Sequence, residues 1–101
     1  MKSIEELLQA YEIDASDPAG MGRFEALNML TNRDVIEEKR SQLTTSQAAR
    51  LLFADEKLMS HHMQVIDECG GQTEFVRLRQ HDPSPSAWWW FLEQVSVEQF
   101  S

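Results

Sequence analysis

The sequence predicts an all-α protein built around a long antiparallel helical hairpin. Three observations predict this fold: paired capping signals, apolar residues at helical spacing, and a tight connection between the two longest patterns. The chain has 101 residues, and we expect a single helical domain over residues 1–101. A short N-terminal helix and a tryptophan-rich C-terminal helix are expected to pack across the hairpin.

The N-terminal helix is predicted by a capping box. The Ser3 hydroxyl can accept a hydrogen bond from the amide of Glu6, whose side chain can accept one from the amide of Ser3. The loop that follows, DASDPAGMG, places Asp14 and Glu25 at the spacing of the first and last ligands of a calcium loop. Pro18 occupies a ligand position, so we expect no calcium site. The apolar face of the predicted N-terminal helix contains Ile4, Leu7, Leu8 and Tyr11.

The first arm of the hairpin is predicted over residues 21–43. The seven-residue spacing of Met29, Ile36 and Leu43 favours one continuous or barely kinked helix packed against a partner helix. A separate helix over residues 34–43 is the alternative, because a second capping signal precedes that segment.

The second arm is predicted over residues 44–71. Thr44 and Gln47 form another capping box, and Gly70 and Gly71 can adopt the left-handed conformation that ends a helix. Between these signals, apolar residues at steps of three, four or seven predict one buried stripe. Its members are Ala48, Leu51, Leu52, Leu58, Met59, Val65, Ile66 and Cys69.

Two polar residues, Asp55 and His62, fall on this stripe. The helix could break near Ala54, with Asp55 capping a second segment, or it could continue and place both residues in a buried or interfacial polar site. They are seven residues apart, roughly 10 Å along the axis, so a third group or another chain would have to join them. Buried charges are rare unless paired, which favours the break or partial exposure.

Beyond the second arm, residues 73–79, TEFVRLR, alternate polar and apolar side chains and predict a short strand or extended segment. The sequence offers this strand no partner, so it would pair with its own copy in a dimer or would not be a strand. Ser84 as cap and Pro85 at the first helical position then predict the C-terminal helix. Its core-facing stripe is predicted to be Trp88, Phe91, Leu92 and Val95.

Three consecutive tryptophans are the most function-related feature of the sequence. On a helix they span about 200° of arc, so Trp89 or Trp90 must point away from the core. Exposed tryptophan is typical of contact surfaces; the alternative is that the loops of a small domain enclose the rings. The predicted partner-binding residues are Trp89, Trp90 and Phe91, supported by Met59 and Met63 as an adaptable apolar surface.

The chain is acidic, with a net charge of −8. Residues 1–17 hold one basic and five acidic groups (−4), residues 18–57 six of each, and residues 58–101 two basic and six acidic groups (−4). This balance disfavours nucleic acid and anionic lipid as partners. We expect no membrane span and no signal peptide, and the single cysteine fits a cytoplasmic, reducing compartment.

The reactive residue types form no recognisable catalytic motif. His61 and His62 lack a ligand-type residue four positions later, so the helical zinc spacing is absent, although a site shared between two copies stays open. A thiolate at Cys69 is disfavoured by the negative end of a helix. No phosphate-binding glycine loop or nucleophile motif is present. We therefore expect no enzyme, no catalytic residue, no cofactor and no metal.

Residues 43–52, LTTSQAARLL, resemble the opening helix of MerR-type or excisionase helix-turn-helix proteins. The resemblance implies DNA binding, with FVRLR standing for a wing. The sequence departs from the family pattern after Leu52, where FADEKL supplies no turn glycine and no basic recognition helix follows.

Taken together, these features predict a small acidic protein–protein interaction module: an adaptor, regulator or accessory subunit, expected to be a homodimer. Its partners would be its own copy, another protein, or both. Two alternatives stay open. An acidic inhibitor that imitates nucleic acid needs carboxylates in rows at phosphate-like spacing, and a helix-turn-helix DNA-binding regulator needs a basic face.

Overall fold

Five α-helices and three short 3₁₀ helices (η) make up the part of the chain that the computed structural model describes, residues 2–79, 83 and 86–94. No strand occurs in these residues, so the all-α prediction is confirmed. None of their helices has the length and apolar character needed to span a membrane. In chain order the elements are α1 (Ile4–Ser16), α2 (Gly22–Glu38), η1 (Arg40–Gln42), α3 (Thr45–Ser60), α4 (His62–Glu68), α5 (Gln72–Arg77), η2 (Trp88–Trp90) and η3 (Leu92–Gln94).

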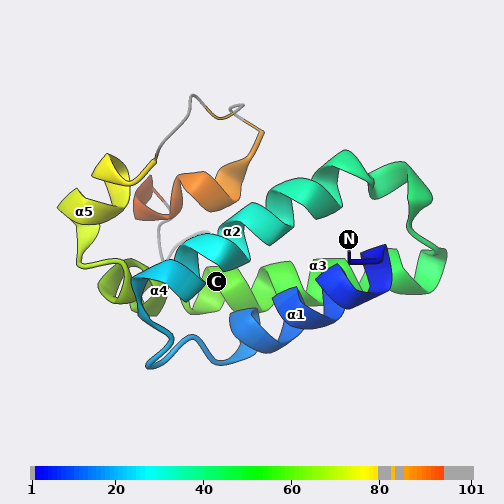
Figure 1. The fold of residues 1–101 in the computed structure, drawn as a ribbon, viewed down its shortest axis with the longest axis horizontal. Helices are drawn as coiled ribbons and strands as arrows, with labels where there is room; N and C mark the ends of the chain where they lie inside the picture. Colours follow the sequence, from blue (N-terminus) through cyan, green and yellow to red (C-terminus); the bar gives the residue numbers. More distant parts are fainter. Residues whose placement is uncertain (1, 80–82, 84–85, 95–101) are drawn as a thin grey trace.

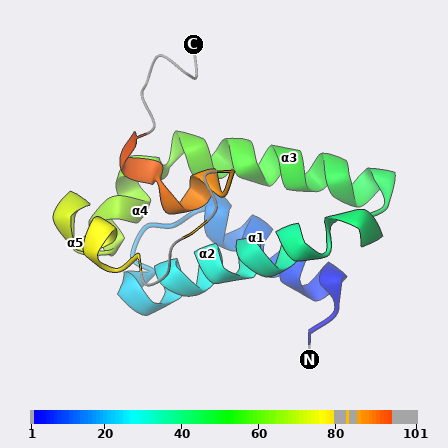
Figure 2. The ribbon, with the colours of Figure 1, turned by 90° about the horizontal axis from the view of Figure 1, so that it is seen from above.

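The predicted two-helix hairpin includes a third helix, α1. α2 and α3 run in opposite directions and are connected through η1, but α1 packs against both of them (Figures 1 and 2). α1 is too short to be stable alone, and it buries an apolar face between the two arms. The buried residues of that face are Leu7, Leu8, Tyr11 and Ala15.

Both predicted capping boxes are present. The amide of Glu6 donates to Ser3 Oγ over 3.2 Å, and the amide of Gln47 donates to Thr44 Oγ1 over 3.1 Å. In each box the longer side chain also accepts a hydrogen bond from the capping residue's amide. The first arm starts as one continuous helix, as predicted, but α2 ends at Glu38 instead of Leu43, and the short 3₁₀ helix η1 follows it.

The predicted break near Ala54 is wrong. α3 continues to Ser60, and the break falls at His61, after which α4 resumes. Asp55 therefore lies inside α3 and caps nothing, because its carboxylate is paired within the core. The glycine stop is confirmed, since Gly70 and Gly71 both have φ of 104°. Their amides donate 3.0 Å hydrogen bonds to the carbonyls of Asp67 and Ile66, which closes the end of α4.

The predicted strand at residues 73–79 is wrong, because most of this segment forms α5. The amide of Phe75 donates to the Gly71 carbonyl over 2.9 Å, and Glu74 binds Arg77 one helical turn later. Phe75 is the only buried side chain of α5, so the short polar–apolar alternation did not distinguish a strand from a helix.

The tryptophan segment forms two 3₁₀ turns instead of the predicted α-helix. The amide of Phe91 donates to the Trp88 carbonyl over 2.9 Å, three residues apart. Trp89, Trp90 and Leu92 are buried, whereas Trp88 and Phe91 are half-buried, so the predicted core stripe is wrong in part. The predicted C-terminal helix also included Ser84, Pro85 and Val95, which lie outside the described residues.

Candidate functional site

The five predicted partner-binding residues are divided between core and surface. Trp89 and Trp90 are 3% and 4% exposed, whereas Met63 is 60% exposed. Phe91 and Met59 are half-buried. Trp89 and Trp90 lie in η2, Met59 in α3 and Met63 in α4, and of the five residues only Met63 presents most of its side chain to solvent.

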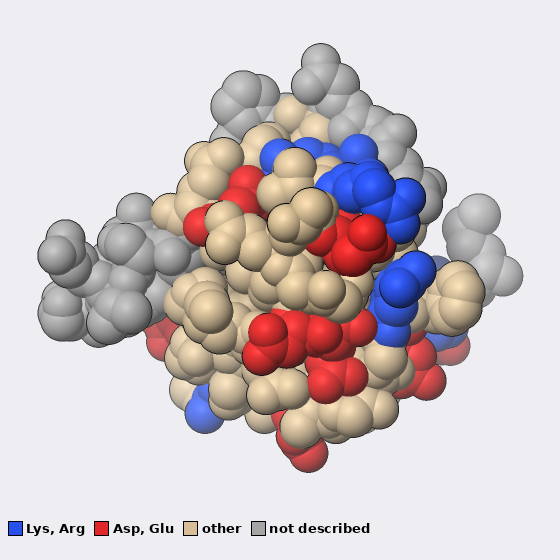
Figure 3. All heavy atoms as spheres, turned by 90° about the vertical axis from the view of Figure 1, so that its left-hand side faces the viewer, with Lys and Arg blue, Asp and Glu red and all other residues tan. Residues whose placement is uncertain are grey.

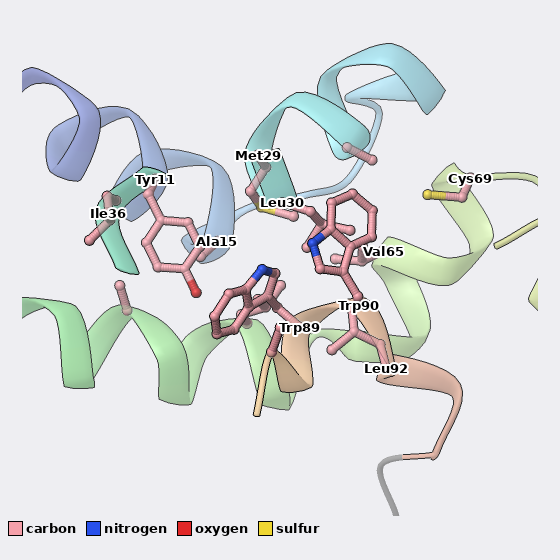
Figure 4. Packing of buried hydrophobic residues seen from close by; sticks show 14 of the residues in the cluster. Tyr11, Ala15, Met29, Leu30, Ile36, Val65, Cys69, Trp89, Trp90 and Leu92 are labelled. Atoms are coloured by element: carbon pink, nitrogen blue, oxygen red, sulfur yellow. The ribbon is translucent and has the colours of Figure 1, made fainter. Parts of the chain in front are cut away.

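One carboxylate accepts hydrogen bonds from both buried indoles. The Nε1 groups of Trp89 and Trp90 donate to Asp34 Oδ1 over 2.7 and 2.8 Å. Figure 4 shows the two rings packed between α2 on one side and α3 and α4 on the other. A buried indole requires an acceptor for its N–H group, and α2 supplies it. The described part of the chain itself thus encloses these rings, which is the alternative that the sequence left open.

A buried polar cluster of Arg33, Asp55 and Tyr11 lies where α1, α2 and α3 meet. Arg33 donates from Nε and Nη2 to the two oxygens of Asp55 over 2.9 and 3.0 Å, and the Tyr11 hydroxyl donates to Asp55 Oδ1 over 2.6 Å. Arg33 also binds Glu37 at 3.0 Å, and its Cζ lies 4.3 Å from the ring centroid of Trp89. The interpretation of Asp55 as part of a buried polar site is confirmed, with Arg33 and Tyr11 as its partners.

The buried polar cluster is suited to holding helices together and is closed to substrates. Arg33 is 1% exposed and Asp55 is 7% exposed. Burial, and then the charge of Asp55, raises the pKa of Tyr11. Burial lowers the pKa of Arg33, but hydrogen bonds and charge from Asp55 outweigh that effect and raise it. Both donors, Tyr11 and Arg33, therefore keep their protons at neutral pH.

His61 and His62 each bind a backbone carbonyl, and Cys69 is buried. His62 donates from Nδ1 to the Met59 carbonyl over 2.8 Å, and His61 donates to the Ala15 carbonyl over 3.0 Å, because a carbonyl can only accept. Burial raises the pKa of Cys69 to about 11, so its thiol is a poor nucleophile. No cluster of three potential ligands among the described residues could hold a metal ion.

An exposed apolar surface lies on the outward side of α3. Leu52 and Phe53 are 62% and 60% exposed, and Ala48 and Ala49, one turn earlier, are also exposed. The structure describes every residue of α3, and the exposed charged residue among them is Glu56. We call these five residues the outer α3 face. α3 runs along one edge of the molecule (Figure 2), and the exposure of these five side chains places them on its outer surface.

Other apolar groups border the outer α3 face or lie elsewhere. Met59 is half-buried one turn after Asp55, and Met63 follows it in α4, beyond the break. Lys57 lies over the ring of Phe53, with Nζ 5.2 Å from the ring centroid. The other large exposed apolar residues of the described chain are Ile13 on α1, Phe24 on α2 and Val76 on α5.

The sequence contains a signal for this face that the predicted stripe overlooked. The stripe assigns Ala48 and Leu52 to the buried side, which is wrong, and it omits Phe53. Leu51, Leu52 and Phe53 are consecutive and span about 200° of a helix, so one side cannot bury all three. The inward side takes Leu51, which leaves the next two residues outside.

The structure lacks two features that the helix-turn-helix resemblance needs. α3 continues to Ser60, so no turn follows LTTSQAARLL, and FVRLR begins within α5 instead of forming a wing strand. The resemblance therefore carries no further argument about function. No protein-family model matches the chain, and comparisons with curated proteins and with solved structures gave no match either.

Proposed function

We propose that this protein is a protein–protein interaction module and that the outer α3 face is its contact surface. One observation carries the proposal: Leu52 and Phe53 are neighbours on one turn of α3, and each exposes about three-fifths of its side chain. Adjoining exposed apolar groups, rimmed by polar residues, are typical of sites where another macromolecule binds. The small Ala48 and Ala49 beside them would let a partner approach the helix closely.

The size of this face indicates the kind of partner. Complete burial of a Leu or Phe side chain contributes about 1.5–3 kcal/mol, so covering what Leu52 and Phe53 expose contributes roughly 1–2 kcal/mol each. Association itself costs at least about 4 kcal/mol. A partner must therefore cover more than these two residues of one chain, as an apolar helix laid along α3 would do.

The proposal keeps some of the predicted contact residues and gives others a different role. Met59 and Met63 would extend the outer α3 face at its C-terminal end. Trp89 and Trp90 would act from inside the core by fixing η2 against α2 through Asp34. These roles follow from exposure, since a residue buried in the monomer offers little surface to a partner.

The alternative of an acidic nucleic-acid mimic has weaker support. Arg50 binds both Glu5 and Glu12, and Arg77 binds Glu74, so these carboxylates are paired instead of lying in a free row. Hydrogen bonds, first of all from Arg50, lower the pKa of Glu5 to about 2. At the end of the molecule formed by α4 and α5, acidic and basic side chains lie next to one another (Figure 3).

The proposal is tested by comparing three forms of the full chain as immobilised bait in an extract of the cells that express it. Leu52→Glu places a charge on the outer α3 face, and Val76→Glu places the same charge on the 43% exposed Val76 of α5 as a control. Circular dichroism first establishes that all three forms are equally helical. We expect a protein, or a further copy of the chain, that binds wild type and the control but not Leu52→Glu. Identical binding by all three forms contradicts the proposal.

A further inference from the structure

We infer that the occupant of the outer α3 face is a second copy of this chain, bound with the two α3 helices antiparallel. The inference rests on the proposed function and makes it specific. The twofold axis would pass between Arg50 and Leu51, so Leu52 of one copy faces Ala49 of the other and Glu56 faces Thr45. Spacing, side-chain size and charge along α3 each support this arrangement.

The outward residues of α3 have the spacing of a helix that packs on another helix. Thr45, Ala49, Leu52, Glu56 and Met59 follow one another at steps of four, three, four and three. Such steps keep side chains on one line along a helix, as in a coiled coil. The first four of these residues are exposed and the last is half-buried, so the line belongs to the surface of the monomer.

The sizes of the side chains along this line are complementary to themselves. The small residues Ala48 and Ala49 precede the large residues Leu52 and Phe53 by one turn. When two copies run antiparallel about the stated axis, the large pair of each helix meets the small pair of the other. Large groups opposite small groups allow close packing along the whole contact. No third component is needed to fill the interface, because an isologous contact uses the same residues twice.

Glu56 disfavours a parallel pair and an antiparallel pair centred on Ala54. In a parallel pair Glu56 would face its own copy, and like charges repel. In an antiparallel pair centred on Ala54 it would face Leu52 and lose its hydration without gaining a partner. In the proposed register it faces Thr45, in the first turn of the partner helix. There the hydroxyl can donate to the carboxylate, and the positive end of the helix dipole favours a negative charge.

The overall charge gives the inference a second, independent consequence. Each copy carries a net charge of −8, so two copies repel each other at long range. Added salt screens that repulsion and leaves the apolar contact intact. Self-association should therefore strengthen as salt rises, whereas binding to a basic partner would weaken.

The experiment is sedimentation equilibrium of the full chain at low and at moderate salt, about 0.05 and 0.5 M. We expect wild type to shift from one copy to two as concentration rises, more readily at the higher salt. At low salt, Thr45→Glu should weaken association by about fivefold, since a symmetric pair contains the altered contact twice. Glu56→Lys also lowers the net charge of each copy and is therefore tested together with Thr45→Glu. The double variant should regain at least wild-type association, because the two introduced charges are opposite and attract across the interface. Both positions are exposed, and circular dichroism controls for folding.

Each result decides a different part of the reasoning. A dimer that responds to Leu52→Glu but shows no recovery in the double variant overturns the inferred register while leaving the outer α3 face in use. A wild-type chain that stays monomeric at about 1 mM at both salt concentrations overturns a second copy as the occupant. In that case the comparison of the three immobilised forms still tests the proposed function, independently of self-association.

Discussion

Asp55→Ala is expected to lower the free energy of unfolding by about 3–5 kcal/mol. The substitution leaves the guanidinium of Arg33, which is 1% exposed, without the two hydrogen bonds of 2.9 and 3.0 Å that compensate its burial. Removing one partner of a buried ion pair typically costs this amount. Glu37 remains bound to Arg33 at 3.0 Å, which favours the lower end of the range. The total stability of a small domain is about 5–15 kcal/mol, so the loss is a large part of it.

Three further variants test how much each interaction of the buried polar cluster contributes to the free energy of unfolding. Tyr11→Phe removes one 2.6 Å hydrogen bond to a charged acceptor and should cost about 1.5–3 kcal/mol. The double variant Arg33→Met with Asp55→Leu removes both charges and should be more stable than Asp55→Ala, because apolar groups can replace a complete buried pair. Glu37→Gln is the control: its side chain is 42% exposed, so the loss should be below about 1 kcal/mol.

Urea unfolding, followed by circular dichroism and tryptophan fluorescence, measures these differences. With a slope of about 1–3 kcal/mol per molar urea, a loss of 3 kcal/mol lowers the midpoint by roughly 1–3 M. An Asp55→Ala variant within about 0.5 kcal/mol of wild type would refute the conclusion that the pair is enclosed. A double variant less stable than Asp55→Ala would refute the account of uncompensated charge.

Three other predictions concern separate parts of the fold. Asp34→Ala should cost about 2–4 kcal/mol and shift tryptophan emission to the red, because two buried indoles lose their acceptor, whereas Asp34→Asn retains an acceptor oxygen and should cost less. Thermal unfolding should show Gly70→Ala to be more destabilising than Gly71→Ala: both have φ of 104°, but only at Gly70 would a Cβ meet Glu74, at 3.3 Å, and each loss should be about 1 kcal/mol or more. The pKa of Cys69 is raised to about 11, so the unfolded chain releases this proton first; stability should fall between about pH 8.5 and 11, and Cys69→Ala should reduce that fall.

The sequence predicted the helix boundaries best where neighbouring residues decide the conformation. The capping boxes at Ser3 and Thr44 depend on contacts between residues three apart, and both are present. The glycine stop at Gly70 and Gly71 is also local, because it needs only two residues that tolerate a positive φ. Such signals are complete within one turn, so no knowledge of the fold is required.

Two of the wrong predictions concern residues whose conformation depends on distant partners. Asp55 looked like a cap because a charge on an apolar stripe is unfavourable alone, and its partner Arg33 lies 22 residues earlier. The two enclosed indoles depend on Asp34, more than fifty residues away in sequence. No pattern within one helix contains these pairings, so the break near Ala54 and the tryptophan helix could not be corrected from the sequence.

The candidate site was only partly predictable, for a related reason. The arc argument applied to the tryptophans also applies to Leu51, Leu52 and Phe53, and it would have identified an exposed apolar group on this helix. It cannot say which of the three residues is covered, since that depends on where α1 packs. Met59 and Met63 were predicted for their chemistry and follow this group along the chain, in α3 and in α4.

The tryptophan anchor has a consequence for how the protein is made. Trp89 donates to Asp34, 55 residues earlier, and its ring lies against the guanidinium of Arg33. On the ribosome, α1, α2 and α3 leave the exit tunnel before Trp89 does, so Arg33 and Asp55 can pair while still lacking their aromatic cover. We therefore expect the nascent chain to pass through a helical stage with an open core. A chain cut short before residue 88 would remain in that stage and would be open to proteases and chaperones that remove incomplete products.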